Sequence, residues 1–413
     1  MQNDVKILRR LADEYAVFAR SERNKEKIEL HRSMNDLNQK RPIVLIDEIP
    51  WHEMHIGDEL KLQCSNPYFR EVEWFLRSTL YKFRHMPADM AVTDYIPVAK
   101  IIESTGIGVE VDEKTIQSES GEGVQSHQYH NQFEDHNIEK LHNPIISYNK
   151  EETVRRYNML GEAIGDIIPI KITGEATGYG LGCKTWDIIP TLIGVDHLLM
   201  GLIDRPDFMH ELAKKLTDIF LSIVHQYDAL NLFDTESLYV HCTAATTSDM
   251  PMSEGDYEHS NTRKLWGRGL AQILATVSPD MHDEFDITYM IKAMEPFGLI
   301  YYGCCEPLHN KIHILEKIPR LRKISITPWA DINVAADIIG KRYVVSAKPN
   351  PSNLSSGILD NDVIRRELSS ILDACKRNDC AVELVLKDIS TVGGRPQNLF
   401  EWEKIAMELV NAY

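Results

Sequence analysis

Two thiols, a carboxylate and an imidazole fall close together at the predicted end of one strand. The segment reads Cys304-Cys305-Glu306-Pro307-Leu308-His309 and follows the apolar run 299–302 almost directly. Sulfur, oxygen and nitrogen donors of this kind suit zinc, and a catalytic zinc keeps one position open for a substrate. The sequence therefore predicts a metal site at this strand end, with Glu306 also a candidate catalytic group.

The ligand set of this predicted site has to draw on more than one strand. Neighbouring residues of an extended chain point to opposite sides, so one thiolate with Glu306 and a ligand from another strand is the simplest arrangement. His241, Cys242 and His309 are candidates to complete it. The alternative is that the two cysteines pack beneath the loop while Glu306 caps the following helix, since none of these residues belongs to a CxxC or HxxxE motif. The predicted metal ligands are Cys304, Cys305, Glu306 and His241.

Acidic and aromatic residues follow the first predicted strand. Asp47 and Glu48 come directly after the run 41–46 and are candidate catalytic residues. Trp51 and His52 come next and, with Trp329 after a later strand, predict an aromatic pocket, although such aromatic residues are as often part of a core. The run Trp-His-Glu-Met-His from residue 51 is one residue short of the HExxH zinc motif, so a metalloprotease is disfavoured.

These residues must be positioned by the strands and helices between them. Short apolar runs alternate with amphipathic helical patterns from residue 41 onward, in about eight units, which is typical of a parallel sheet buried on both faces. We therefore predict an α/β fold in which residues 41–413 form a (β/α)8 TIM barrel, with a doubly wound open sheet as the alternative. The residues after each strand of a barrel meet at its carboxyl end, where catalytic sites lie. The predicted strands are 41–46, 90–92, 167–172, 238–240, 299–302, 323–326, 343–346 and 382–386, and the predicted helices are 70–83, 152–165, 207–230, 280–296, 332–340, 361–378 and 398–411.

Three further segments depart from this alternation. Residues 1–40 carry apolar side chains at helical spacing and are predicted to form a long helix, an N-terminal extension that caps the barrel or pairs with a second subunit. The polar stretches 104–150 and 243–262 are predicted to be inserted loops. In the first of them three histidines crowd into residues 127–136, where a solvated loop is favoured over a metal cluster. The glycine-rich segment 178–182 is predicted to be a mobile loop at the barrel mouth. The three histidines are His127, His130 and His136.

Composition excludes several classes of function. The 413 residues carry 45 Lys and Arg against 62 Asp and Glu, a formal net charge of −17, which repels a phosphate backbone or an anionic membrane surface. No apolar run is long enough for a membrane span, the N-terminus does not resemble a signal peptide, and seven thinly spread cysteines suit a reducing compartment. Neither GxGxxG nor a Walker motif is present. We expect a cytoplasmic protein that binds neither nucleic acid nor membranes. Four of the cysteines, Cys64, Cys183, Cys375 and Cys380, are expected to be small buried residues.

Several segments spread over residues 40–413 match, in order, the pattern of one known family. The chain resembles the uroporphyrinogen decarboxylase superfamily in these segments, and the resemblance implies a (β/α)8 barrel with its pocket at the strand carboxyl ends. They are Val277-Ser278-Pro279-Asp280-Met281-His282-Asp283-Glu284-Phe285, Tyr302-Gly303-Cys304-Cys305, Lys348-Pro349-Asn350-Pro351, and Thr391-Val392-Gly393-Gly394-Arg395-Pro396 with Leu399, Trp402 and Ala406.

The superfamily contains two chemistries, and the residues distinguish between them. Porphyrin decarboxylases carry arginines after the first strand, where this chain has Asp47 and Glu48, and two anions there would repel a polyanionic substrate. The other branch comprises zinc-dependent, corrinoid-linked methyltransferases. Cys304 matches a zinc-binding cysteine of its thiol-methylating members, but Tyr302 replaces their histidine and no third cysteine follows the last strand. The closer resemblance is to the methyltransferase components of O-demethylase systems.

This resemblance implies a methyltransferase that moves a methyl group from an aromatic methyl ether to a Co(I) corrinoid, with zinc as Lewis acid. The chain lacks an Asp-x-His-x-x-Gly motif, so the cobalamin is expected on a separate corrinoid protein. Methyl transfer from a methylamine or thioether, methyl transfer to a thiol, and a decarboxylase are the alternatives, as is a binding protein without activity. A homodimer is expected. The implied substrate-binding residues are Trp51, His52, Gln272, Trp329 and Lys348, with Asp388 as a further polar contact.

Overall fold

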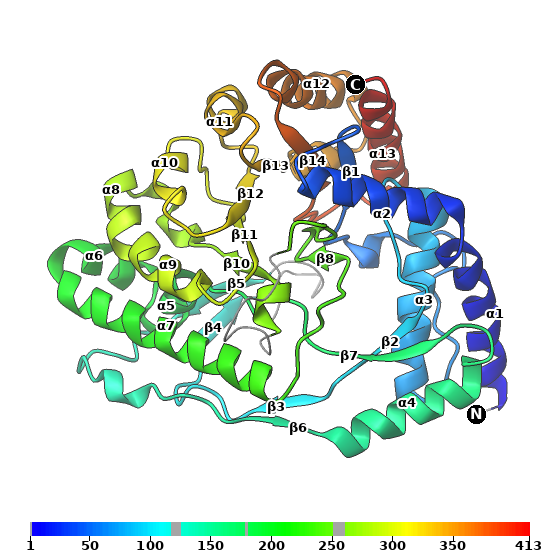
Figure 1. The fold of residues 1–413 in the computed structure, drawn as a ribbon, viewed down its shortest axis with the longest axis horizontal. Coiled ribbons are helices and arrows are strands. Elements are labelled where there is room, and N and C mark those ends of the chain that lie inside the picture. The colour runs from blue at the N-terminus through cyan, green and yellow to red at the C-terminus, as the bar shows by residue number, and fades with distance from the viewer. Residues whose placement is uncertain (1, 117–124, 178–180, 251–260) are drawn as a thin grey trace.

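A computed structural model describes residues 2–116, 125–177, 181–250 and 261–413 of the chain. Its centre is a parallel sheet of six strands, which Figure 1 shows with helices packed around it. Every neighbouring pair in this sheet is parallel. The strand order is β1 (Ile43–Ile46), β14 (Ala381–Leu386), β13 (Val344–Ala347), β12 (Leu321–Ile326), β11 (Leu299–Tyr302) and β10 (Trp266–Gly269).

The remaining described strands form four two-stranded sheets. One of these is parallel and pairs β2 (Ile96–Ala99) with β7 (Ile170–Thr173). Isolated parallel bridges also join Glu175 to Phe233 and Cys183 to Gly269. The fold is thus α/β with a central parallel sheet; within the described ranges the strand pairs do not close into a ring, so the eight-stranded barrel stays a prediction. The antiparallel pairs are β3 (Ile102–Ser104) with β6 (Ile146–Tyr148), β4 (Glu113–Ile116) with β5 (Ser126–Tyr129), and β8 (Tyr239–Val240) with β9 (Thr243–Ala244).

Helices cover the sheet on the side away from the site. The last three follow their strands in order and pack on β13, β14 and β1, and the middle one contacts the other two. The segment between α8 and α9 is a π-helix over Asp283–Ile287. The helices after residue 60 are α3 (Pro67–His85), α4 (Lys150–Ile164), α5 (Thr185–Ile193), α6 (Val195–Asp204), α7 (Pro206–Ala229), α8 (Pro279–His282), α9 (Thr288–Met294), α10 (Ile312–Leu315), α11 (Ile332–Ile339), α12 (Asn361–Arg377) and α13 (Pro396–Asn411).

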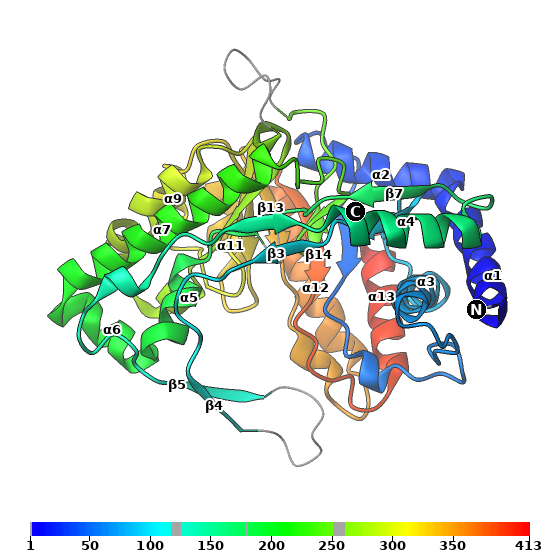
Figure 2. The same ribbon diagram turned by 90° about the horizontal axis from the view of Figure 1, so that it is seen from below.

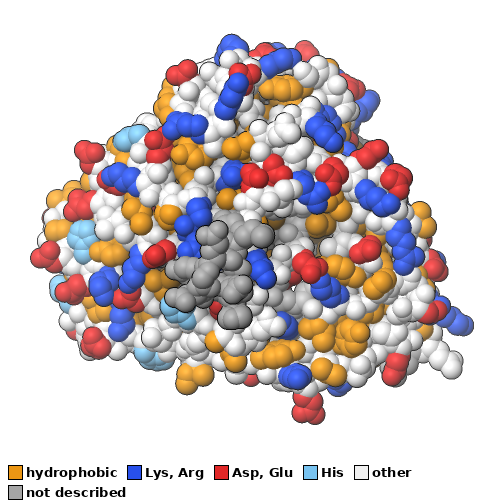
Figure 3. Space-filling model, viewed as in Figure 1, with side chains coloured by type: hydrophobic (Ala, Val, Ile, Leu, Met, Phe, Trp, Pro, Cys, Tyr) orange, Lys and Arg blue, Asp and Glu red, His pale blue; other side chains and the backbone are white. Residues whose placement is uncertain are grey.

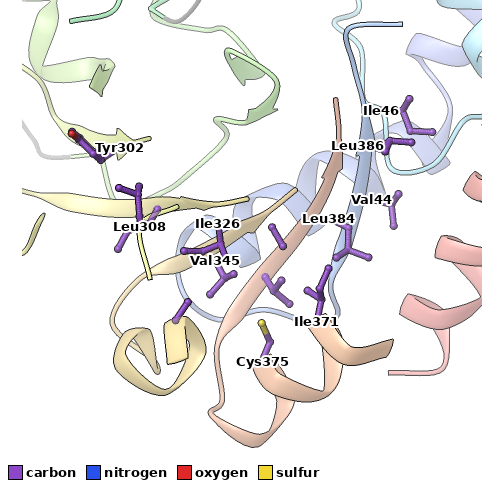
Figure 4. Close-up of a cluster of buried hydrophobic side chains, with 14 of the residues drawn as sticks. Val44, Ile46, Tyr302, Leu308, Ile326, Val345, Ile371, Cys375, Leu384 and Leu386 are labelled. Carbon is purple, nitrogen blue, oxygen red and sulfur yellow. The ribbon is translucent and has the colours of Figure 1, made fainter. Parts of the chain in front are cut away.

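The two faces of the central strands carry different kinds of residue. Apolar side chains at alternate positions, such as Val44, Val345 and Leu384, form one large core with α12, as Figure 4 shows. Successive residues of a strand point to opposite faces, so the residues between them face the other way. Those residues include Lys323, Ser346 and Glu383, all fully buried. The inner face therefore carries buried polar side chains beside apolar ones such as Ile43 and Val385, whereas the outer face is apolar.

The N-terminal segment forms two helices rather than the single long helix expected. α1 (Gln2–Ala19) ends before Ser21, whose hydroxyl caps α2 (Glu22–Asn35) by accepting a hydrogen bond from Asn24 N. Serine at this position competes with the helix for backbone donors, which breaks the helix there. α1 packs against α3 and α4.

Most predicted elements are found, and most of the differences lie in the first half of the chain. The run 90–92 does not form the predicted strand; residue 89 instead donates its backbone N–H to Val44 O, and β2 begins at Ile96. α5, α6 and β10 were not predicted. Among the described residues no single helix is long and apolar enough to cross a membrane, and only the bent pair α5 and α6 passes that test of length and composition.

Part of the first inserted segment extends away from the body of the molecule. β4 and β5 project as a hairpin from the body (Figure 2), and His127 and His130 on it are exposed and paired with Glu113 and Asp112. The predicted glycine-rich loop falls largely on 178–180, and much of the second insertion on 251–260, outside the described residues. On the face shown in Figure 3, acidic and basic side chains are interspersed with apolar ones.

Candidate functional site

Two cavities meet at the carboxyl edge of the sheet, and the two adjacent cysteines border both. Cavity A, about 440 Å³, is also bordered by Glu48, His241 and Gln272. Cavity B, about 430 Å³, is bordered instead by Trp329, Lys348 and three prolines. Lys387 and Asp388 border both cavities as well. Residues that follow six other strands therefore border the two cavities around Cys304 and Cys305.

The backbone at Gly303 turns the two thiols toward one another. Gly303 has a positive φ of 98°, and a Cβ there would lie 2.6 Å from Leu308 Cδ1, so glycine is required on both grounds. The turn ends the extended strand, and the adjacent side chains no longer point to opposite sides. The Sγ atoms of Cys304 and Cys305 are 3.7 Å apart. A tetrahedral zinc with bonds of about 2.3 Å to two thiolates separates the sulfur atoms by about 3.8 Å.

Lys387 supplies the positive charge next to this thiol pair. Its Nζ lies 3.6 Å from Cys304 Sγ and 3.8 Å from Cys305 Sγ. The same ammonium donates to Asp388 Oδ2 at 2.6 Å and lies 3.3 Å from Glu48 Oε2. Cys305 Sγ donates to Asp388 Oδ2 at 3.2 Å. The two thiols, one ammonium and two carboxylates form one connected group, which we call the edge cluster.

These contacts shift the pKa values of the cluster. The hydrogen bond from Cys305, together with the charges of Lys387 and Arg268, lowers the pKa of Cys304 to about 7 against the opposing effect of burial. The same hydrogen bond and burial raise the pKa of Cys305. Burial alone would lower the pKa of Lys387, but the nearby thiolates and Asp388 outweigh it and raise that pKa. Near neutral pH the pair therefore holds a thiolate beside a charged lysine.

Glu48, a member of the cluster, and His241 both border cavity A and follow other strands than the cysteines. Burial, and then the hydrogen bond with Asp388, raise the pKa of Glu48, so these two carboxyl groups share a proton more readily than isolated ones. His241 Nε2 lies 3.8 Å from Glu48 Oε1. Burial and the positive charges of Arg268 and Lys387 lower the pKa of His241 to about 2. The imidazole is neutral, which is the form that binds a metal.

Glu306 lies beneath the thiol pair instead of beside it. The side chain is 1% exposed, and its oxygens accept hydrogen bonds from Ala271 N at 3.2 Å and Cys304 N at 2.9 Å. Burial raises its pKa. Both oxygens hold backbone donors of neighbouring loops, so to bind a metal Glu306 would first have to release one. Its role as a ligand stays a prediction. The alternative, that Glu306 caps the following helix, does not match these hydrogen bonds, which go to Ala271 N and Cys304 N.

The other predicted residues are divided among the cavities. Gln272 borders cavity A, but it already binds Asp187. Its backbone N donates to the Asp187 carboxylate at 2.8 Å, and its side-chain Nε2 donates at 2.6 Å. Trp329, 70% exposed, stands at the rim of cavity B. Trp51 borders a third cavity of about 510 Å³, cavity C, together with Asp47. The structure thus separates the two tryptophans expected to share an aromatic pocket.

Trp51 and His52 also differ from each other. The Trp51 ring packs edge-on against Trp74, with centroids 5.4 Å apart, and against Tyr81 at 5.9 Å. His52 is exposed, and its Nε2 lies 3.6 Å from Glu53 Oε1. Trp51 therefore belongs in part to a packed aromatic group, as the alternative interpretation of such residues allowed.

A second polar group lies deeper between the strands. Lys323 Nζ is 3.1 Å from Glu383 Oε1, and both side chains are fully buried. Ser346 Oγ donates to Glu383 Oε1 at 2.6 Å and accepts from Lys348 Nζ at 2.5 Å. Burial lowers the pKa of Lys323 to about 8. We call Lys323, Ser346 and Glu383 the inner layer.

Sequence reasoning missed Lys387 and Arg268 as site residues. Lys387 directly follows β14, whose only charged residue is Glu383, and continued alternation places Lys387 on the same face as Glu383. Arg268 is buried between two glycines in β10. A charged residue in a buried strand is the signal that could have identified both. Among the described residues, no three His, Cys, Asp or Glu side chains are already grouped as a metal site would need.

Comparisons with known proteins give structural resemblances but no sequence match. No family model matches the sequence, and no curated protein matches it. The solved structure of a methyltransferase from Methanosarcina mazei is similar with a TM-score of 0.49 and 11% sequence identity, over 92% of this chain and 98% of that chain. The function has to follow from the chemistry of the site itself.

Proposed function

We propose that this chain is a methyltransferase that moves a methyl group from a small donor, an aromatic methyl ether, to the Co(I) corrinoid of a partner protein. The observation that carries the proposal is the thiol pair of Cys304 and Cys305, 3.7 Å apart and bordering two cavities. With it we propose that the segments around β2, β7 and β8 complete a (β/α)8 barrel with the central sheet. The resemblance of residues 277–285 and 302–305 to the uroporphyrinogen decarboxylase superfamily supports the same proposal.

The donor set fits zinc. The thiols have the spacing of two ligands on one tetrahedral ion, and one of them is already ionised near neutral pH. His241, neutral, and Asp388, 3.2 Å from Cys305, are the residues that would complete the set. When bound, zinc would supply a Lewis acid that offsets the negative charge on the leaving oxygen. Lys387 would remain as the charge that keeps the thiols anionic.

The chain's own residues also provide a proton for the leaving group. The raised pKa of Glu48 means that one of its carboxyl oxygens can hold a proton beside cavity A. A phenolate that leaves from a methyl ether takes up a proton, so Glu48 is the proposed general acid. The Co(I) centre gives the electron pair that forms the new bond to carbon, and the carbon–oxygen bond breaks. Asp47 borders cavity C and is a weaker candidate.

The test is methyl transfer to free cob(I)alamin by the purified chain loaded with zinc. The donors are methoxyarenes, with methylamines and thioethers as the alternative classes, and loss of the Co(I) absorbance reports transfer. We expect turnover with methoxyarenes by the wild type and at least a thousandfold less by the double variant Cys304→Ser/Cys305→Ser, because removal of a Lewis acid costs several kcal/mol of transition-state stabilisation.

A matched control separates the thiol pair from cysteines in general. Cys380→Ala removes a buried thiol that packs in the outer core and should leave transfer unchanged. Turnover with amines or thioethers alone would move the proposal to that donor class. Transfer by the double variant at the wild-type rate, or release of CO2 from a donor without any transfer, contradicts it.

A further inference from the structure

Three lysines project from neighbouring strands into the polar interior, and they differ in their partners. Lys323 is paired with Glu383 at 3.1 Å, and Lys387 with Asp388 and Glu48 at 2.6 and 3.3 Å. Lys348 has no carboxylate within ion-pair distance among the described residues. Its Nζ donates to Ser346 Oγ at 2.5 Å and lies 5.6 Å from the centroid of the Tyr301 ring. Lys348 reaches Glu383 only through the hydroxyl of Ser346, so it retains donors for a directly bound negative group.

The surroundings of Lys348 make this unusual. The residue is 5% exposed, so its ammonium has lost most of its water. An ammonium that is buried without a carboxylate is costly to the fold, and such groups are normally paired. Burial lowers the pKa of Lys348, and a bound anion would restore it. The cost is offset when a ligand with a negative charge enters.

A second unused polar group borders the same cavity. Thr327 follows β12, is 4% exposed and borders cavity B with Lys348. Its Oγ1 is buried and has no hydrogen-bond partner among the described residues. The backbone N–H of Lys348 donates to Ile326 O, the carbonyl just before Thr327. Thr327 and Lys348 are therefore neighbours at the ends of adjacent strands. A buried hydroxyl and a buried ammonium, both with spare donors, match the two oxygens of a carboxylate.

The rest of cavity B is suited to an apolar body. Pro328, Pro349 and Pro351 border it, and Trp329 stands at its rim. Its volume of about 430 Å³ falls in the range of pockets that hold small organic ligands. Cys304 and Cys305 border the same cavity, so a ligand there lies next to the edge cluster.

We propose that the small-molecule substrate of this site carries a carboxylate, which Lys348 and Thr327 receive, and that its apolar body lies against Trp329 and the prolines of cavity B. This inference rests on the proposed function only for the statement that the bound molecule is the methyl donor. The recognition of the carboxylate depends on Lys348 itself.

Binding of benzoate and of its uncharged analogue benzamide, measured by calorimetry, tests the proposal. The protein is used without metal, so that the carboxylate has no zinc to bind. We expect benzoate to bind the wild type at least about tenfold more tightly than benzamide, as a charge-assisted hydrogen bond predicts. Lys348→Met should reduce this preference to less than about twofold, and Lys348→Arg should retain most of it.

The controls separate local charge from general charge and from misfolding. Lys82→Met removes another lysine, one that borders cavity C and donates to Ile46 O, and should leave the preference unchanged. Thr327→Val removes the hydroxyl alone and should weaken benzoate binding by a few fold. Circular dichroism of each variant shows whether it folds. Equal binding of the two ligands by the wild type, no binding of benzoate, or an unchanged preference in Lys348→Met and Thr327→Val would overturn the proposal.

Two combinations of results distinguish this inference from the proposed function. If anisole is demethylated but benzoate does not bind, the substrate class is wrong and the methyltransferase stands. If benzoate binds through Lys348 but no donor yields methylcobalamin, the carboxylate site stands and the methyltransferase is wrong. With both correct, Lys348→Met should raise the KM for 4-methoxybenzoate about tenfold and leave that for anisole unchanged.

Discussion

The inner layer and the edge cluster use the same residue types, a lysine and carboxylates. β14 contributes to the first, and the residue directly after β14 contributes to the second. Glu383 belongs to the first and Lys387 to the second, four residues further along the same face. The inner layer is fully buried, and its charged side chains have partners. The edge cluster borders two cavities and adds two thiols. The charged groups of the inner layer are buried and paired with one another, so the inner layer is a structural element. The edge cluster borders cavities that a ligand can enter and has a lowered thiol pKa, so it is the candidate for chemistry.

The comparison predicts that each region controls a different property. A change in the inner layer should alter stability, and a change in the edge cluster should alter reactivity at nearly constant stability. Three variants test this separation, in order of decreasing effect.

The largest effect is expected from Glu383→Ala. The change leaves Lys323 buried without its carboxylate, and breaking a fully buried ion pair in this way costs about 3–5 kcal/mol of the free energy of unfolding. Denaturant unfolding measures it. Glu408→Gln, which breaks the exposed pair with Arg365, should cost less than about 0.5 kcal/mol. A loss below 1 kcal/mol in Glu383→Ala would show that the inner layer is not the stabilising element described.

Lys387→Met should change reactivity through the thiol pKa. Because a depressed pKa keeps the thiolate populated down to lower pH, alkylation of the wild-type pair in metal-free protein should reach half its maximal rate near pH 7. Without the ammonium the midpoint should rise toward the ordinary value of 9.0, and the rate at pH 7 should fall by up to about a hundredfold. Mass spectrometry of the peptide that contains both cysteines gives the rates.

The outcome that contradicts this prediction is an unchanged midpoint. Lys82→Met serves again as the control lysine. Stability of Lys387→Met should fall by less than that of Glu383→Ala, because the freed Asp388 is half exposed and remains solvated.

Glu306→Gln sharpens the boundary between the two regions. Glutamine has one acceptor oxygen, so one of the two backbone donors, Ala271 N or Cys304 N, loses its partner, at a cost of about 1–2 kcal/mol in denaturant unfolding. We expect zinc content to stay unchanged, since both carboxylate oxygens already serve the backbone. A loss of zinc at constant stability would return Glu306 to the ligand set.

The sequence predicted the second half of the fold well because its strands are continuous apolar runs. β11 matches its predicted range, and β12, β13 and β14 lie within two residues of theirs. β10 was missed because two of its four residues are glycine and one is Arg268. The break at Ser21 was missed although a serine before charged residues is an ordinary helix start.

The site was predicted as a location but not as an arrangement. The thiol pair could be found because both residues are adjacent in sequence. The contact of Lys387 with Cys304 joins residues 83 positions apart, and nothing local encodes it. Glu306 was expected beside the thiols because it follows them, but the turn at Gly303 directs it beneath them. The order of residues along the chain predicts which residues lie near the site. The directions of their side chains depend on the backbone turn at Gly303, which the sequence pattern did not predict.

The most direct measurement is zinc X-ray absorption on the metal-loaded protein, with metal content from the same sample. The account predicts one zinc per chain with two sulfur neighbours at about 2.3 Å and lighter atoms completing the shell. Cys304→Ser/Cys305→Ser should lose that zinc while Cys380→Ala keeps it. A zinc without sulfur neighbours, or a wild-type protein that holds no zinc at all, would contradict the central claim that this thiol pair is a metal site.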